Sequence, residues 1–144
     1  MPGKYKIVFI VVTICLLFGV LIGLRLWYKP HADIKDANAA LVSAVTLYNK
    51  FTGDSTAADH LYKEKILLVS GNVNQVFLNK ENHQVILLKT DINNGYVNCT
   101  MEENTPNPAI GEMINIKGLC SGYNGEQDLG LAGDVIMVRC YNKN

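Results

Sequence analysis

The sequence has few of the residues from which metal and catalytic sites are built. Its three histidines, His31, His60 and His83, fall in different segments, and its four cysteines include no Cys-x-x-Cys pair. The common structural zinc sites need closely spaced Cys and His ligands, so this spacing argues against them. No Ser or Cys is visibly partnered with a histidine as a nucleophile would be. The sequence therefore predicts no catalytic site, no metal site and no cofactor.

Acidic residues are absent from the first 30 positions, and basic residues are scarce after them. From His31 onward, Lys and Arg number 9 and Asp and Glu number 13, a net charge of 9 − 13 = −4. Binding to the phosphates of a nucleic acid depends on clustered Lys and Arg. The charge balance therefore argues against nucleic acid as a partner of this part of the chain.

One long apolar run lies near the N-terminus. No charged residue occurs from Ile7 to Leu24, and the apolar character continues through Trp27. At about 1.5 Å per residue, such a run covers the ~30 Å hydrocarbon core of a bilayer. Trp27 falls where aromatic residues line the membrane interface, and Pro30 cannot continue a helix. The sequence predicts a transmembrane helix from Ile7 to Trp27.

A secretory signal peptide and a lipoprotein signal, both of which are cleaved, also contain an apolar run. A secretory signal peptide needs a shorter apolar core and small residues at its cleavage site, and neither occurs before Arg25. Cys15 follows a bulky isoleucine in mid-run, which argues against a lipoprotein signal. We therefore expect residues 1–30 to form an uncleaved signal-anchor. Lys4 and Lys6 favour a cytoplasmic N-terminus and an extracytoplasmic domain, although Arg25 and Lys29 favour the reverse.

Residues 31–64 have the pattern of a helical lead-in. Asp33 is a candidate N-cap, Gly53 is a candidate end, and Asp54 or Ser55 is a candidate cap for a second short helix. An apolar stripe at helical spacing is expected to pack on the following domain. It consists of Ile34, Ala37, Leu41, Ala44, Val45, Tyr48 and Phe51.

Residues 65–144 have the pattern of short strands. Gly71 marks a bend inside the first strand, Asn79–Asn82 is a polar turn, Asn93-Asn94-Gly95 is a hairpin signal, and Ser121–Gly133 is a glycine-rich loop. The predicted strands are Ile66–Leu78, Val85–Lys89, Tyr96–Met101, Met113–Cys120 and Asp134–Tyr141. We expect a mainly β fold, in which one transmembrane helix and two short helices precede a five-stranded barrel of the OB type. An open β-sandwich is the alternative.

Two stretches also carry a family resemblance. One is Val69-Ser70-Gly71-Asn72-Val73, and the other is Ile114-Asn115-Ile116-Lys117-Gly118-Leu119-Cys120-Ser121-Gly122, followed by Asp134-Val135 and Cys140. Over residues 37–141 the chain resembles the tRNA_anti-like OB-fold family, which is found in many bacterial membrane-anchored proteins. The resemblance implies the OB fold. It implies no reaction, because the family as a whole has no assigned activity.

Three cysteines, Cys99, Cys120 and Cys140, fall on predicted strands. A disulfide is expected to be stable outside the cytoplasm. The third and fifth strands of an OB barrel are neighbours, which favours Cys99–Cys140, but Cys99–Cys120 is also compatible with the pattern. Three reduced cysteines packed as small apolar residues are the alternative.

Loops of OB barrels frame the ligand groove, so we expect ligands on the face between Asn79–Asn82 and Ser121–Gly133. The candidate contact residues are Tyr123, Asn124, Glu126 and Asp128. The function that fits is a non-enzymatic, membrane-anchored module that binds an envelope protein, a peptide or a small ligand.

A cytoplasmic module that binds single-stranded nucleic acid is the alternative function. Such a site combines aromatic stacking with a basic groove. The strands offer three aromatic and three basic residues for this role, Phe77, Tyr96, Tyr141, Lys89, Lys117 and Arg139.

Overall fold

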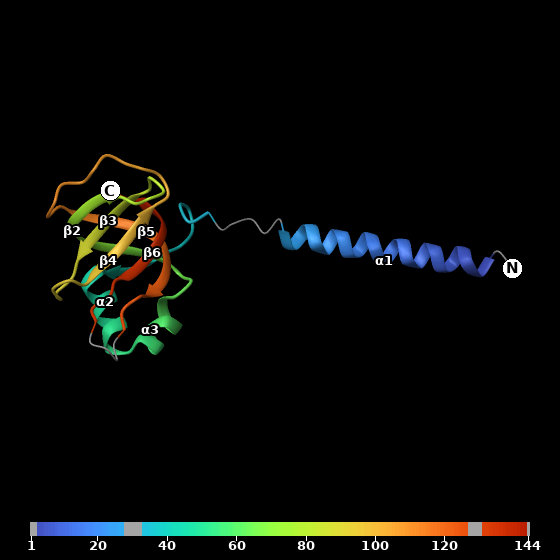
Figure 1. The fold of residues 1–144 in the computed structure, drawn as a ribbon, viewed down its shortest axis with the longest axis horizontal. Helices are drawn as coiled ribbons and strands as arrows, with labels where there is room; N and C mark the ends of the chain where they lie inside the picture. The colour runs from blue at the N-terminus through green and yellow to red at the C-terminus, as the bar shows by residue number, and fades with distance from the viewer. Residues whose placement is uncertain (1–2, 28–32, 127–130, 144) are drawn as a thin grey trace. The chain divides into compact units, whose positions relative to one another are not determined.

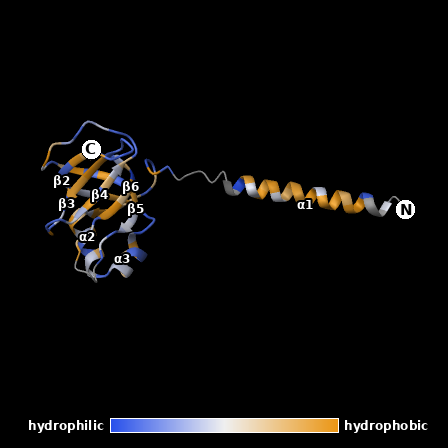
Figure 2. Ribbon diagram, in the orientation of Figure 1, coloured by the Kyte–Doolittle hydropathy of each residue, from blue (hydrophilic) through white to orange (hydrophobic). Residues whose placement is uncertain are grey.

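The computed structural model describes residues 3–27, 33–126 and 131–143. The chain divides into two units, Met1–Asp33 and Ile34–Asn144. The first unit contains helix α1 (Gly3–Trp27), which includes the predicted span (Figure 1). Within α1, Lys6–Arg25 is long and apolar enough to cross a membrane, and none of it is buried. Figure 2 shows apolar residues along most of this helix. Pro30, the predicted stop, lies outside the described residues.

Five strands of the second unit form a closed barrel, which confirms the predicted mainly β fold. They are β2 (Ile66–Leu78), β3 (Gln84–Lys89), β4 (Tyr96–Met101), β5 (Met113–Tyr123) and β6 (Val135–Asn142). The order is β2-β3-β4-β6-β5, and β5 pairs back with β2. Only the β4–β6 pair of this ring is parallel. β5 runs three residues beyond its predicted end at Cys120, so the glycine-rich loop begins later than expected.

Strand β2 bends where the sequence places Gly71. Its first half pairs with β5 through Asn72, and its second half pairs with β3 from Val73 onward. A Cβ on Gly71 would lie 2.9 Å from the Cβ of Ala44 and 3.2 Å from that of Leu88. The missing side chain therefore lets three elements approach one another where β2 changes partners.

The lead-in differs from its prediction. A strand, β1 (Ala40–Ser43), occupies part of the expected long helix and pairs in parallel with β2. Val42 is buried while its neighbour Leu41 is 73% exposed, because successive side chains of a strand point to opposite sides. Asp33 does not cap helix α2 (Ala44–Gly53), which begins eleven residues later. The side chain of Ser43 caps α2 instead and accepts a hydrogen bond from the next turn.

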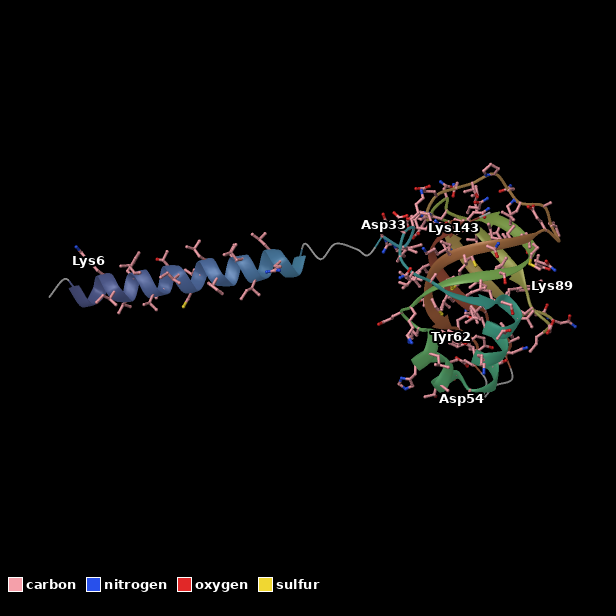
Figure 3. The ribbon with its side chains drawn as sticks, turned by 180° about the vertical axis from the view of Figure 1, so that it is seen from behind. Lys6, Asp33, Asp54, Tyr62, Lys89 and Lys143 are labelled. Carbon is pink, nitrogen blue, oxygen red and sulfur yellow. The ribbon has the colours of Figure 1, made fainter. Side chains whose placement is uncertain are left out.

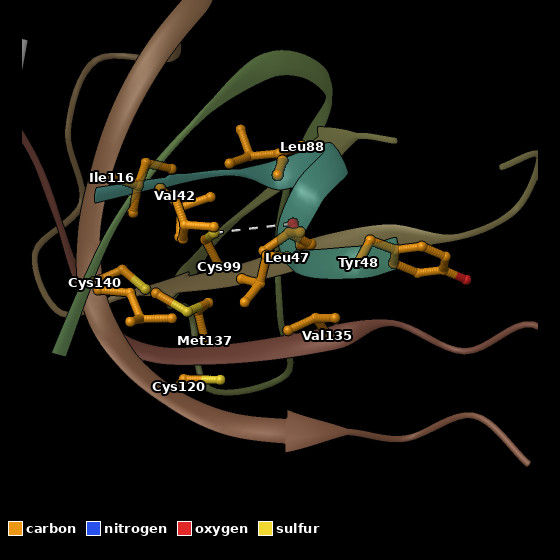
Figure 4. Close-up of a cluster of buried hydrophobic side chains, with 14 of the residues drawn as sticks. Val42, Leu47, Tyr48, Leu88, Cys99, Ile116, Cys120, Val135, Met137 and Cys140 are labelled. Atoms are coloured by element: carbon orange, nitrogen blue, oxygen red, sulfur yellow. Dashed lines mark hydrogen bonds between the residues drawn. The ribbon is translucent and has the colours of Figure 1, made fainter. Parts of the chain in front are cut away.

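Two short helices follow β1, as expected. Helix α2 ends at Gly53, and the side chain of Asp54 accepts a hydrogen bond from the Ala57 amide at the start of α3 (Ser55–Tyr62). The buried face of α2 carries Leu47, Tyr48 and Phe51, which join the barrel core. Figure 4 shows Leu47 beside the sulfur-containing residues of that core.

Candidate functional site

The outer surface of strands β3 and β4 is the candidate binding face. Val97, Cys99 and Met101 of β4 are buried in the core, so the alternate residues of this strand point outward. Residues paired directly opposite one another share a face of the sheet, which extends the surface across β3 to β2. This β3–β4 outer face consists of Gln75, Phe77, Val85, Leu87, Lys89, Tyr96, Asn98 and Thr100.

The chemistry of the β3–β4 outer face is apolar and amide-rich. Phe77 is 40% exposed, whereas Val85 and Leu87 of the middle strand are only 3% and 8% exposed. Among the described residues, Lys89 is the one charged member of this face. Asn98 and Thr100, which the sequence reading missed, could have been found from the alternation in β4.

The other two cations considered for nucleic-acid binding are engaged elsewhere. The Lys117 ammonium donates hydrogen bonds to the backbone carbonyls of Lys35 and Ala37, and the whole residue is 8% exposed. Arg139 lies 3.9 Å from the carboxylate of Glu102. The barrel therefore offers no row of free cations along this face in the part of the chain that the structure describes.

The two loops that were expected to frame the ligand lie at opposite ends of β4. At its start, the Tyr96 amide donates to the Asp134 carboxylate at the end of the glycine-rich loop. Beyond its end, Asn104 donates to the carbonyl of Asn82 in the polar turn, and Gln84 bonds to Thr105. The β3–β4 outer face thus runs between the two loops.

Three of the four predicted contact residues are bonded within their own loop. The Tyr123 hydroxyl accepts from the Gly133 amide at 3.1 Å, and the Asn124 side chain accepts from the Asp134 amide at 2.6 Å. The carbonyl of Glu126 accepts from the Leu131 amide. Asp128 lies outside the described residues. The ligand role of this set stays a prediction, and its described members fix the shape of the loop.

An aromatic cluster joins this loop to α2. The rings of Tyr48 and Tyr123 meet edge to face at 5.9 Å, and Phe51 stacks on Tyr123 at 6.3 Å. The Tyr48 hydroxyl donates to the carbonyl of Gly133. Burial, and then the hydrogen bond with Tyr123, raise the pKa of Tyr48 well above its ordinary value. Tyr48 is therefore a neutral donor that holds the loop on the helix.

The barrel core holds three thiols, Cys99, Cys120 and Cys140 (Figure 4). Burial raises the pKa of the Cys120 thiol to about 11. Burial, with a hydrogen bond to Cys99, raises the pKa of Cys140 well above its usual range. Thiols of this kind are protonated and unreactive near neutral pH. The structure holds all three as thiols, and the disulfide stays a prediction.

The acidic, histidine and cysteine side chains of the described residues do not gather into a metal centre. The described residues contain no group of three or more His, Cys, Asp and Glu side chains that could hold a metal ion. A polar groove of about 330 Å³ lies beside the bend of β2, and its lining includes Ser43, Ser70, Asn72, Lys89 and Asp91. Lys89 and Asp91 give its lining one charge of each sign.

The family model described as tRNA_anti-like matches residues 1–138, so the chain belongs to this family. A comparison with curated proteins gives no match.

Proposed function

We propose that this tRNA_anti-like protein is a membrane-anchored binding module, and that its β3–β4 outer face takes an extended peptide from a protein of the cell envelope. The observation that carries the proposal is the composition of this face. It presents amide and hydroxyl groups beside an exposed phenylalanine, and Lys89 is its one charge among the described residues. Amides and hydroxyls can bond to a peptide backbone, whereas phosphates need several cations.

We propose that α1 is an uncleaved anchor with its N-terminus in the cytoplasm. Lys6–Arg25 has the length and hydropathy of a membrane span. Lys4 and Lys6 at the N-terminal end of the span favour this orientation under the positive-inside rule, and Arg25 and Lys29 at the other end favour the reverse. A reporter fused to the C-terminus tests the orientation, because a phosphatase that is active only outside the cytoplasm would be active here. Activity of a cytoplasm-dependent reporter instead would reverse the assignment.

A photo-reactive amino acid tests the ligand face. We would place it at Asn98 in the centre of the face, with Leu61, which is 54% exposed on α3, as the matched control. After irradiation of intact membranes, we expect an adduct at Asn98 but not at Leu61. Protease should shorten this adduct and nuclease should leave it unchanged. A nuclease-sensitive adduct would favour the nucleic-acid alternative, and equal yields at both positions would remove the β3–β4 outer face as the site.

A further inference from the structure

A gap interrupts the strand pairing of β2 where this strand bends. In the closed barrel, β3 and β5 lie on opposite edges of β2, and β1 lies on the same edge as β3. On that edge, β1 pairs through Ser70 and β3 pairs from Val73 onward. The backbone of Val73 bonds to Gly111 and Glu112 on the β5 side, so the neighbouring Asn72 turns its backbone groups toward the gap.

The polar groove of about 330 Å³ opens at this gap. One wall is the segment in which β3 ends and the chain leaves β2, and it carries Lys89 and Asp91. Ser43 and Val45, at the start of α2, and Met113, at the start of β5, complete the lining. Figure 3 shows Lys89 at the outer margin of the barrel. Sites for small molecules begin at about this volume, so the groove has room for one small ligand.

The groove contains two opposite charges that have no protein partner. Neither Lys89 nor Asp91 forms an ion pair or a side-chain hydrogen bond with another described residue. Thr90 lies between them and is held in place, because its hydroxyl donates to the carbonyl of Gly95 at 2.6 Å. The turn therefore fixes the backbone on which both charges are carried, and each charge remains available to a ligand.

We propose that this groove binds a small zwitterion, namely an α-amino acid with an apolar side chain. Its carboxylate lies at Lys89, and its ammonium group lies at Asp91. Its side chain packs on the apolar part of the lining, where Val45 is half-buried and Met113 is 62% exposed.

The charges of the groove select this class of ligand. A ligand with one charge pairs with one wall residue and meets a like charge at the other, whereas a zwitterion pairs with both. Phosphate groups are held by several cations, and a magnesium or calcium ion is held by several oxygen ligands. The groove has one lysine and one carboxylate in its lining, which fits neither of these ligands.

Titration of the full chain in detergent micelles with L-leucine tests the proposal. The backbone amide signals of Gly71 and Asn72 in NMR spectra report on the groove. Leucinamide keeps the ammonium group and lacks the carboxylate, and N-acetyl-leucine keeps the carboxylate and lacks the ammonium group. Because both groove charges are exposed, we expect each contact to strengthen binding by about two- to five-fold. Leucine should therefore bind more tightly than either analogue.

Two results of this titration would overturn the proposal. One is the absence of any shift at Gly71 and Asn72 with leucine up to about 10 mM, since a ligand of this size in an open groove binds in the millimolar range. The other is equal binding of leucine and N-acetyl-leucine. That result would leave Asp91 without a role and would point to the C-terminus of a peptide as the ligand.

Two variants assign the charges separately. Lys89→Met should abolish the preference for leucine over leucinamide and keep the preference over N-acetyl-leucine. Asp91→Asn should have the opposite effect. Lys80→Met, in the exposed polar turn, is the matched control and should change neither preference. Unchanged preferences in Lys89→Met and Asp91→Asn, or the same loss in Lys80→Met, would refute the assignment. Amide signals of the barrel core show whether each variant keeps its fold.

Discussion

The replacement Lys117→Met should release the segment before β1, residues 34–39, from the barrel without unfolding the barrel. Lys117 is 8% exposed, and its ammonium donates to two carbonyls of that segment. Methionine retains most of the apolar stem and loses both hydrogen bonds. Hydrogen bonds from charged groups contribute about 1.5–3 kcal/mol net, so we expect the docked segment to lose about 2 kcal/mol. The side chain of Ile34, which is 2% exposed, still packs on the barrel in this variant and keeps part of the segment in place.

Trypsin cleavage after Lys35 measures this change. The bond lies inside the docked segment, and proteolysis of a folded protein follows the population of the locally open form. A loss of about 2 kcal/mol raises that population about 30-fold, and cleavage should accelerate by the same factor. Lys80→Met, at an exposed turn position, is the matched control and should leave the rate unchanged. An unchanged rate in Lys117→Met, or equal acceleration in both variants, would refute the role given to Lys117.

Three further predictions concern the barrel core. Gly118→Ala would place a Cβ 2.5 Å from the sulfur of Cys140, so urea unfolding should show a loss of about 1–3 kcal/mol. Adding Cys140→Ala should recover part of that loss, and simple additivity would contradict the contact. Tyr48→Phe removes the hydrogen bond to the carbonyl of Gly133, so thermal unfolding should show a free energy of unfolding lower by about 1 kcal/mol. An unchanged free energy of unfolding would show that this bond does not stabilise the fold. Burial raises the pKa of Cys120 from an ordinary 9.0 to about 11 in the folded state. The thiol is therefore protonated in both states below pH 9, and the free energy of unfolding falls as pH rises from 9 to 11, where the unfolded chain loses this proton first. This decrease in the free energy of unfolding amounts to at most about 3 kcal/mol, and Cys120→Ala should make it smaller.

The strands could be predicted from the sequence because their signals are local. β2 has the predicted bounds, since glycine, asparagine and charged residues mark its ends and bend. The alternation within Tyr96–Met101 likewise puts Val97, Cys99 and Met101 on one face, and in the structure this is the buried face of β4. These features depend on neighbours in the chain, which is why a single sequence reveals them.

The lead-in could not be predicted in the same way. Ile34, Ala37 and Leu41 fall at helical spacing by coincidence, whereas in the structure Ile34 is buried on the barrel and Leu41 points away from it. Four residues of β1 are too few to display an alternating pattern. Their strand conformation depends on pairing with β2, more than twenty residues later. Tertiary pairing overrides local propensity in such segments.

Lys117 shows why the number of Lys and Arg residues in this chain does not by itself indicate whether it binds nucleic acid. In sequence it stands among the barrel cations that a nucleic acid would contact. In the structure, a segment some 80 residues earlier takes its hydrogen bonds, and Glu102 lies beside Arg139. The number of cations therefore overstates the positive charge that a ligand meets on the β3–β4 outer face. Because counterion release scales with the cations that contact phosphate, Lys89 alone would support only weak, salt-sensitive binding. The amides of this face can bond to a peptide backbone, and its apolar groups can pack against the side chains of a peptide.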